Sequence, residues 1–470
     1  MIGITAWGAY VPRLRLDRRL IAQAWQTTQP PGARAVANYD EDALTMAWEA
    51  VQSVVGDRGQ RIDGLYFASA SAPYWEKQIA AVVATACDLP RRVFTADFGG
   101  SVRAGTSALL AAVRAVQAGG AQNVVVAAAD ARTPAPESEI EGLFGDAAGA
   151  LSVGKDAVVA EFVDAASISE EFTYVWRTDG SRYVQAFPGK FSNTFGYGRD
   201  LREAVTALLE SNRLEPADIA KLALYSPDAR AASDLAKGMG FDPKRQLPPT
   251  LATTIGCSGN AEAFLQLAAV LEEAQPGDRV LVGSFGEGAD VLLFRVTDAI
   301  AQARTGARVQ EWIETGTALP SYEKYLKYRR ILESDEPTEA ISNVMEFKEL
   351  TQDVRLHGSR CRGCGTVQYP VARVCIKCRA RELEDHPLAR RGTVFTYTVD
   401  HLIANIDHPL LMAVIDLDGG GRVYLQVTDA DAEAVQVGTR VALTFRRLHE
   451  GGGNHNYYWK ARAVRVRGEA

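Results

Sequence analysis

The chain has 470 residues, of which 47% are apolar, and a formal net charge of −7 at pH 7. This length predicts roughly two to three domains with a sizeable core, and the negative charge argues against nucleic acid as the main partner of the whole chain. No apolar run approaches the roughly 18 residues of a membrane span, and the N-terminus reads as an ordinary strand, so we expect a cytoplasmic protein without membrane contact.

The first 130 residues alternate between strand-like and helix-like stretches. Leu44, Trp48, Val51 and Val55 recur at helical spacing, for example, and indicate a helix. Strands are predicted at 2–5, 65–68, 93–96 and 123–130, and helices at 42–55, 76–86 and 107–117. This alternation predicts an α/β protein whose sheet is covered on both faces.

Residues 97–106, with the sequence Asp-Phe-Gly-Gly-Ser-Val-Arg-Ala-Gly-Thr, are typical of a turn from a buried strand into a helix that carries an acyl-transfer nucleophile. The glycines allow a tight turn and a close approach of substrate. The helix that follows directs its free N–H groups and its positive end toward that turn. Val102 stands where a nucleophilic cysteine would be sought.

A second copy of this unit follows later in the chain. A shift of 156 positions (256 − 100) sets Gly100-Ser101-Val102 beside Gly256-Cys257-Ser258, and the helix and strand that follow keep the same register. We therefore expect an internal duplication. Two buried helix N-termini would then face one pocket, with Val102 on one side and Cys257 and Ser258 on the other.

The duplicated halves and four further segments together resemble the thiolase superfamily, in particular its hydroxymethylglutaryl-CoA synthase branch, with ketoacyl-ACP synthase III as a relative. The resemblance spans about residues 1–330, and the four segments are 144–150, 176–180, the pair Phe191 and Tyr197, and 276–282. It implies a five-layered α-β-α-β-α fold, a CoA thioester as substrate, carbon–carbon bond chemistry and a homodimer.

The catalytic side chains that this resemblance implies are replaced in this sequence. The cysteine that holds the acyl group falls at Val102, the acid/base glutamate at Ala70, the histidine at Tyr225 and the asparagine at Cys257. Because valine has no nucleophilic atom, a covalent acyl-enzyme at Val102 is chemically impossible.

We therefore predict an aldol, retro-aldol, Claisen or retro-Claisen reaction on a CoA thioester without a cysteine acyl-enzyme. Tyr225 and Asp228 are the first candidates for proton transfer, followed by Cys257, and Ser258 is a hydrogen-bond donor. The glycine-rich turn around Gly286 is a candidate for binding the thioester oxygen. Two alternatives stay open: a hydroxymethylglutaryl-CoA synthase-type acyltransferase, and a non-catalytic scaffold that binds acyl-CoA.

The C-terminal part carries the strongest local motif. Cys361, Cys364, Cys375 and Cys378 form two Cys-x2-Cys pairs ten residues apart, which is typical of a structural zinc ion with a closed tetrahedral shell. Domains are predicted as a synthase-like domain at 1–330, a linker at 331–352, a zinc ribbon at 353–390 and an OB-like barrel at 391–470. The barrel is expected from strands at 393–399, 411–417, 423–427, 440–445 and 460–467.

This module resembles the rubredoxin-like zinc-ribbon/OB proteins that accompany thiolases and synthases on acyl-CoA, often as a separate subunit. The resemblance implies a further thiolase-type subunit as a possible partner. Nine Lys and Arg residues between Arg355 and Arg391 face only three acids. A basic zinc ribbon with an OB barrel can also bind single-stranded nucleic acid, which leaves that alternative open, although a thioester-binding fold beside it disfavours it.

Overall fold

The computed structural model describes residues 1–56, 62–303, 308–332, 342–402, 407 and 409–464. The chain forms two compact units. Unit 1 comprises Met1–Asn38, Asp42–Ala84 and Leu89–Ile331, and unit 2 comprises Tyr39–Glu41, Thr85–Asp88 and Leu332–Ala470. The boundaries predicted for the four domains stay predictions.

Unit 1 is built on a nine-stranded sheet with the order β11-β12-β13-β8-β1-β7-β6-β4-β5. In chain order its strands are β1 (Gly3–Tyr10), β4 (Gly64–Ala68), β5 (Phe94–Phe98), β6 (Asn123–Asp130), β7 (Ala147–Gly154), β8 (Ala160–Ser169), β11 (Lys221–Leu224), β12 (Arg279–Phe285) and β13 (Gly288–Val296). Strands β1 and β8 share only the pairs Gly3–Glu161 and Ile4–Ala160. The sheet therefore consists of two halves that are joined at this short contact.

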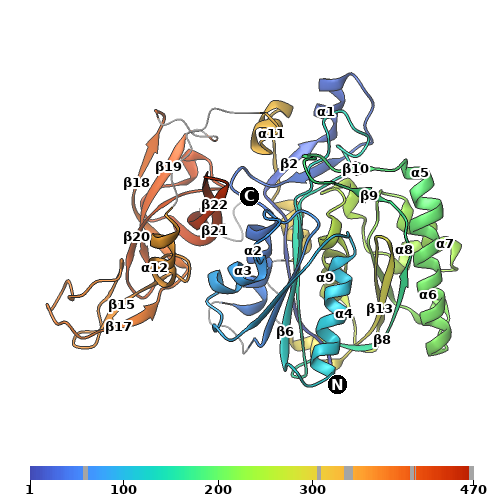
Figure 1. Ribbon diagram of the computed structural model, residues 1–470, viewed down its shortest axis with the longest axis horizontal. Helices are drawn as coiled ribbons and strands as arrows, with labels where there is room; N and C mark the ends of the chain where they lie inside the picture. Colours follow the sequence, from blue (N-terminus) through green and yellow to red (C-terminus); the bar gives the residue numbers. More distant parts are fainter. Residues whose placement is uncertain (57–61, 304–307, 333–341, 403–406, 408, 465–470) are drawn as a thin grey trace. The chain divides into compact units, whose positions relative to one another are not determined.

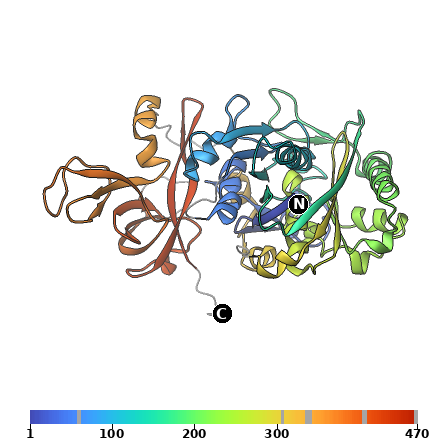
Figure 2. The same cartoon turned by 90° about the horizontal axis from the view of Figure 1, so that it is seen from below.

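Helices α4 (Ala104–Gln117) and α9 (Glu262–Glu273) lie between the two halves. Helix α4 contacts β6 and β13, and α9 contacts β7 and β11. Helix α2 (Ala43–Val55) covers the outer face of one half and α6 (Gly198–Asn212) that of the other, as Figure 1 shows and Figure 2 repeats from a second direction. These five layers confirm the predicted α-β-α-β-α fold. Small residues such as Ala108 and Ala268 are fully buried and let the inner helices pack against both sheets.

The internal duplication is confirmed by the topology. Strand β6 begins at Asn123 and β12 at Arg279, which is the predicted shift of 156 (279 − 123). Strand β6 pairs parallel with β4 and antiparallel with β7, and β12 pairs parallel with β11 and antiparallel with β13. Two helix starts differ from prediction: α3 runs over Ile79–Ala86 and not from residue 76, and α4 begins at Ala104 and not at residue 107. The carboxylate of Asp97 accepts hydrogen bonds from the N–H groups of Ile79 (2.6 Å) and Ala80 (2.9 Å), which fixes the first turn of α3.

Smaller elements complete unit 1. The strands are β2 (Leu14–Asp17), β3 (Ala33–Val36), β9 (Val175–Trp176), β10 (Gln185–Ala186) and β14 (Thr317–Ala318), and the α-helices are α1 (Arg18–Trp25), α5 (Gly189–Ser192), α7 (Ala231–Gly238), α8 (Pro243–Gln246), α10 (Val309–Glu314) and α11 (Tyr322–Tyr328). None of the helices that the structure describes in either unit is long and apolar enough to cross a membrane.

Unit 2 contains a zinc ribbon and an OB barrel. The ribbon strands are β15 (His357–Cys361), β16 (Val367–Gln368) and β17 (Leu383–Pro387), and the barrel strands are β18 (Arg391–Asp400), β19 (Leu410–Leu417), β20 (Arg422–Gln426), β21 (Arg440–Gly451) and β22 (Asn454–Ala463). All five barrel strands were predicted, but the last begins earlier because Gly452 and Gly453 form a turn with positive φ. Its predicted end at 465–467 lies outside the described residues. Residues 333–341 of the predicted linker also lie outside them, and the rest of that linker overlaps helix α12 (Asn343–Asp353).

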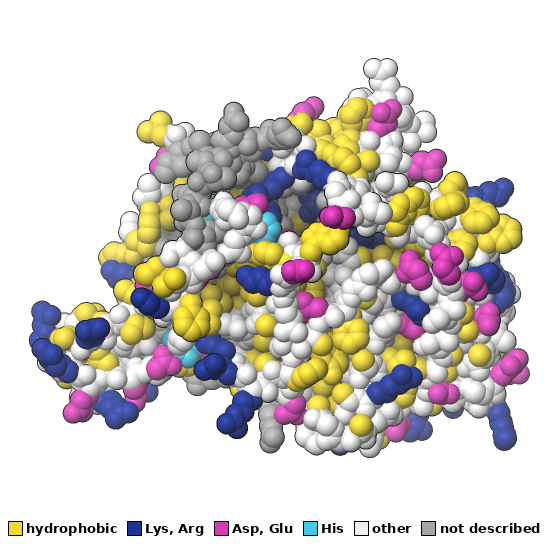
Figure 3. Space-filling view, in the orientation of Figure 1, with side chains coloured by type: hydrophobic (Ala, Val, Ile, Leu, Met, Phe, Trp, Pro, Cys, Tyr) yellow, Lys and Arg dark blue, Asp and Glu magenta, His cyan; other side chains and the backbone are white. Residues whose placement is uncertain are grey.

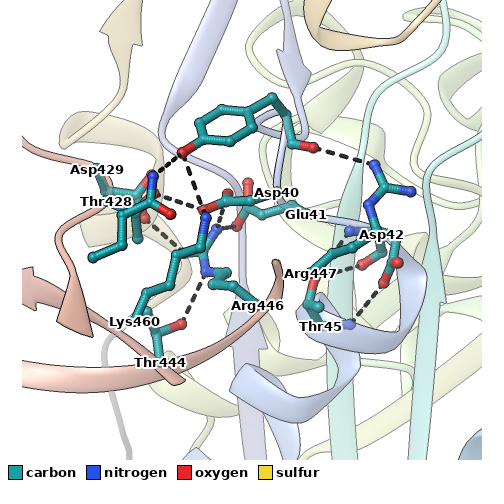
Figure 4. A network of polar contacts seen from close by, with 12 residues as sticks. Asp40, Glu41, Asp42, Thr45, Thr428, Asp429, Thr444, Arg446, Arg447 and Lys460 are labelled. Carbon is teal, nitrogen blue, oxygen red and sulfur yellow. Dashed lines mark hydrogen bonds and ion pairs between the residues drawn. The ribbon is translucent and has the colours of Figure 1, made fainter. Parts of the chain in front are cut away.

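A buried ion network holds Tyr39–Glu41 inside unit 2 (Figure 4). Asp40 accepts a hydrogen bond from Lys460 Nζ at 2.9 Å, and the guanidinium of fully buried Arg446 pairs with Glu41 at 2.5 Å and with Asp429 at 2.6 Å. Burial opposes ionisation of Asp40, but the two cations outweigh it and lower its pKa. These charges are therefore compensated within unit 2.

Candidate active site

The two turns that the duplication predicts to meet do lie together. Gly100 has φ of +79°, and Val102 at the start of α4 is only 2% exposed. Val102 packs in one buried apolar cluster with Tyr197, Tyr225 and Cys257. The second helix start is fixed by its backbone, because the Cys257 N–H donates to Leu143 O at 2.7 Å. Val102 and Cys257 thus border the same small region of unit 1.

Gly286 also lies beside Val102 in this region of unit 1. Ser101 Oγ donates to Gly286 O at 3.2 Å, and a Cβ at position 286 would lie 2.5 Å from Ser101 Oγ and 3.1 Å from Val102 Cγ2, so a larger residue would displace these side chains. However, the Gly286 N–H donates to Gly288 O at 2.9 Å, and the Gly105 N–H of α4 donates to Asn260 Oδ1 at 2.8 Å. These two backbone donors are engaged within the protein, and the role of Gly286 in thioester binding stays a prediction.

Tyr225 and Cys257 are brought together in the cluster. Cys257 Sγ lies 3.4 Å from Tyr225 Oη, which lies 3.1 Å from Tyr174 Oη, and Tyr225 is fully buried. Burial raises the pKa of Tyr225 well above its usual value and also raises the pKa of Cys257. Both groups are therefore neutral near pH 7, and their predicted part in proton transfer stays a prediction.

Asp228 and Ser258 occupy different surroundings. The Asp228 carboxylate accepts hydrogen bonds from Asn193 Nδ2 at 2.7 Å and from the N–H groups of Arg230 and Ala231, at the start of α7. The Ser258 N–H donates to Glu262 Oε2 at 2.9 Å. Their predicted catalytic roles are untested by these contacts.

Two cavities border the apolar cluster. Cavity 1 has a volume of about 1290 Å³, and its lining includes Tyr197 of the cluster, Asp228 and four arginines, Arg18, Arg199, Arg202 and Arg230. Cavity 2 has a volume of about 430 Å³, and its lining includes Val102 of the cluster, Ser69, Ala70, Trp176, Glu287 and Arg132. The turn expected to carry the nucleophile therefore opens into cavity 2.

Two charged residues at cavity 2 were missed by the sequence reasoning. Glu287 Oε2 is buried without a hydrogen-bond partner among the described residues, and burial raises the pKa of this carboxyl, against the opposing effect of Ser101 and Arg103. Its backbone has φ of +47°, a strained conformation for a residue with a side chain. Arg132 is 1% exposed. Two sequence signals could have identified these residues. Glu287 is an acid within a glycine-rich turn, and Arg132 is an arginine just after a buried strand.

A buried carboxyl lies beside the second helix start. Glu262 is fully buried, and burial raises its pKa to about 7, although the hydrogen bonds from Ser258 and the charge of Arg132 act in the opposite direction. This glutamate lies in α9, where the sequence gives no sign that it differs from a surface residue of the helix.

The four cysteines of the zinc ribbon form one cluster. All four Sγ atoms lie within 4.8 Å of one another, with Cys361–Cys378 at 3.5 Å and Cys364–Cys375 at 3.6 Å. Four thiolates about 2.3 Å from a central ion fit this spacing, which is the geometry of a structural zinc site. Lys and Arg side chains gather over this end of unit 2 (Figure 3), and exposed members are Arg360, Arg362, Arg373, Lys377, Arg379 and Arg381. Arg362 pairs with Glu384 at 3.2 Å.

Comparisons with known proteins match the synthase-like part of the chain and its C-terminal module to different families. Residues 351–384 match the family model of the ChsH2 rubredoxin-like zinc ribbon domain, and residues 385–446 match that of the ChsH2 C-terminal OB-fold domain. The hydroxymethylglutaryl-CoA synthase of Methanococcoides burtonii is 30% identical over 322 residues, which cover 65% of this chain and 91% of that protein. The synthase of Pyrobaculum arsenaticum is 29% identical over 344 residues, 70% of this chain and 98% of that one.

Solved structures of the same fold include MvaS in complex with 3-hydroxy-3-methylglutaryl coenzyme A. It has a TM-score of 0.62 and 20% identity, and the match covers 73% of this chain and 94% of that one. The 3-oxoacyl-[acyl-carrier-protein] synthase III of Aquifex aeolicus has a TM-score of 0.57 and 19% identity, over 63% of this chain and all of that one.

Proposed function

The chain belongs to the hydroxymethylglutaryl-CoA synthase family, joined to a ChsH2-type zinc ribbon and OB domain, and from this premise we propose that it acts on CoA thioesters and makes or breaks a carbon–carbon bond without an acyl-enzyme. The single observation that carries the second part is Val102, which occupies the helix start at cavity 2. The nearby thiol of Cys257 is buried, and its raised pKa keeps it protonated, which disfavours it as a substitute nucleophile.

We assign proton transfer in cavity 2 to Glu287. A general acid or base works best when its pKa lies near the working pH, and burial moves the carboxyl of Glu287 in that direction. It lines cavity 2 with Val102, and no hydrogen bond from the described residues occupies its Oε2 atom. Tyr225 is the second candidate, although ionising a fully buried phenol is costly.

The reaction in the cleavage direction follows from these groups. The Glu287 carboxylate takes the proton of a β-hydroxyl group, the bond between Cα and Cβ breaks, and its electron pair remains on the thioester as an enolate while a carbonyl compound leaves. The protonated Glu287 then returns the proton to Cα. In the synthetic direction the same steps run in reverse, and no oxidant or reductant is needed.

We propose cavity 1 as the entry of the CoA moiety. Its volume of about 1290 Å³ exceeds the range of about 300–1000 Å³ that is usual for smaller ligands. Arginines at its wall are suited to binding phosphate groups in pairs of hydrogen bonds. The apolar cluster that borders both cavities would then surround the pantetheine arm.

Exchange of the α-protons of acyl-CoA in D2O, followed by NMR, tests the enolate chemistry without knowledge of the second substrate. We expect the wild-type protein to catalyse this exchange on acetyl-, propionyl- or glutaryl-CoA, and Glu287→Gln to slow it by about 100- to 10,000-fold. The control is Glu273→Gln, at an exposed position that lines neither cavity, which should leave the rate unchanged. Absence of exchange by the wild type on all three thioesters would contradict the proposal and favour a scaffold.

The acyltransferase alternative makes a different prediction. Radiolabelled acetyl-CoA should leave no acid-stable label on the protein, because the proposed reaction has no acyl-enzyme. A stoichiometric label on Cys257 would instead favour the synthase-type reaction.

We also propose a homodimer formed through unit 1. Strand β5 is the last strand of the sheet, so one of its edges has no neighbouring strand within unit 1 as described, and Phe94 on it is 62% exposed. Sedimentation should give twice the mass of one chain, and a monomer would contradict this proposal. A further thiolase-type subunit and a cytoplasmic location remain predictions from the sequence.

A further inference from the structure

The side chain of Asn260 connects the two helix starts that border the candidate site. Asn260 is 2% exposed and lies in the short 3-10 helix Gly259–Ala261, just before α9. Its Oδ1 atom accepts a hydrogen bond from the Gly105 N–H at 2.8 Å, and its Nδ2 atom donates to Ser101 O at 3.1 Å. These partners are 155 and 159 positions away in the chain. One side chain of the second half of the duplication therefore holds the backbone of the first turn, residues 97–106.

The carboxylate of Asp130 orients this amide. Asp130 is fully buried at the end of β6, and its Oδ2 atom accepts hydrogen bonds from the Asn260 backbone N–H at 2.8 Å and from Asn260 Nδ2 at 3.0 Å. Its other oxygen, Oδ1, accepts the Ser69 hydroxyl at 3.0 Å. A carboxylate only accepts hydrogen bonds and the Gly105 N–H only donates one, so the amide nitrogen must face Asp130 and the amide oxygen must face Gly105. The amide is therefore held in one orientation.

The two halves of the duplication differ at these positions. By the shift of 156, Asn260 corresponds to Ala104 (260 − 156) and Asp130 to Gly286 (130 + 156). Because alanine and glycine have no polar side chain, the first half cannot make the reciprocal link to the second turn. The second turn forms without such a link, so the duplicated fold alone does not require it.

The turn that Asn260 holds contacts the segment of the proposed acid and base. Ser101, Val102 and Glu287 all line cavity 2, and Ser101 Oγ donates to Gly286 O at 3.2 Å, directly before Glu287. Ser101 also lowers the pKa of the Glu287 carboxyl, against the larger effect of burial. A shift of the first turn would therefore change both the wall of cavity 2 and the surroundings of Glu287.

We propose that Asn260 is a positioning residue, which holds the first turn against the turn that carries Glu287 and so keeps cavity 2 in its reactive shape. The inference rests on the proposed function, since it concerns the placement of the group to which proton transfer is assigned. Asn260 is not among the residues that line cavity 1 or cavity 2, so it acts through Ser101 and not on the substrate. Its loss should therefore lower turnover and leave thioester binding nearly unchanged.

The exchange of α-protons in D2O by the full-length protein tests this. The probe is the thioester among acetyl-, propionyl- and glutaryl-CoA that the wild type exchanges fastest, and rates at several concentrations give kcat and KM. We expect Asn260→Ala to lower kcat about 10- to 100-fold with KM within about threefold of the wild type. The matched control is Asn123→Ala at the other end of β6, which loses the hydrogen bond from Ser152 Oγ (2.6 Å), lines neither cavity and should leave kcat unchanged.

A pair of substitutions separates positioning from stability. Asn260→Asp sets two carboxylates against each other and should lower both kcat and the melting temperature of the protein. Addition of Asp130→Asn restores a hydrogen bond between the two side chains and should return at least about half of the lost melting temperature. The carboxylate at position 260 still has no N–H group for Ser101 O, so kcat should stay at least about 10-fold below the wild type. This double variant also serves if Asn260→Ala fails to fold.

Three results would overturn the inference. A kcat of Asn260→Ala within about threefold of the wild type would do so and leave the proposed function intact. Recovery of kcat together with the melting temperature in the double variant would also overturn it, because Asn260 would then serve stability alone. Absence of exchange by the wild type on all three thioesters would overturn the proposed function together with this inference.

Discussion

Replacing Glu262 by glutamine should stabilise the protein in a pH-dependent manner. The pKa of this carboxyl is about 7 in the folded chain against 4.5 for an ordinary glutamate. Below about pH 4.5 the carboxyl is protonated in both the folded and the unfolded chain, so its burial does not lower the stability through charge. Above about pH 7 the carboxyl is ionised in both, and folding must bury a charge. The difference of about 2.5 pKa units corresponds to about 3 kcal/mol of lost stability at alkaline pH. The amide of glutamine avoids this loss and keeps an acceptor for the Ser258 N–H.

The assay is urea unfolding of both proteins, followed by tryptophan fluorescence at about pH 5 and about pH 8.5. We expect the variant to gain about 2.5 kcal/mol relative to the wild type between these conditions, with most of the gain appearing between about pH 5 and pH 7.5. Glu210→Gln, at an exposed position, is the control and should show no such gain. A stability difference between Glu262→Gln and wild type that is the same at both pH values would refute the reasoning.

Three further outcomes are expected. Tyr225→Phe removes the hydroxyl beside Cys257, and if Tyr225 carries a proton, α-proton exchange falls by at least about 100-fold at an unchanged melting temperature; an unchanged rate removes it from the mechanism. Chelation of zinc should unfold the ribbon first, seen as protease cleavage between 357 and 387 while unit 1 stays intact, and simultaneous loss of both units would contradict this. Asp40→Ala removes the ion-pair partner of Lys460 and should cost unit 2 about 3–5 kcal/mol in calorimetry. Thr428→Ala, which loses one hydrogen bond to Asp40, should cost about 1 kcal/mol, and equal losses would argue against the ion network.

The fold could be predicted because its signals are local or periodic. The strands and helices before residue 130 follow from apolar spacing, and a constant shift along the chain indicated the second half and brought Val102 and Cys257 to one region. The zinc site follows from cysteine spacing alone.

The charged residues of the candidate site could not be predicted, because their states depend on contacts distant in sequence. Arg132 is distinctive because its guanidinium is buried and donates to the backbone of Cys257, 125 positions away. Glu287 is distinctive because burial removes its solvent. The expectation of free N–H donors at both turns rested on helix geometry, which does not reveal that the side chain of Asn260 satisfies one of them.

The ion network of unit 2 has a consequence for the order of events during synthesis. Asp40 and its partner Arg446 are 406 positions apart. At about 5–20 residues per second a ribosome needs roughly 20–80 s to extend the chain from one to the other. Throughout that interval the carboxylates of Asp40 and Glu41 lack Arg446 and Lys460, the cations with which they pair in the folded protein. Residues 332–470 made as a separate chain would bury Arg446 and Lys460 with Asp429 as a counter-charge but without Asp40 and Glu41, so we expect that piece to be less stable than unit 2 with its early segment.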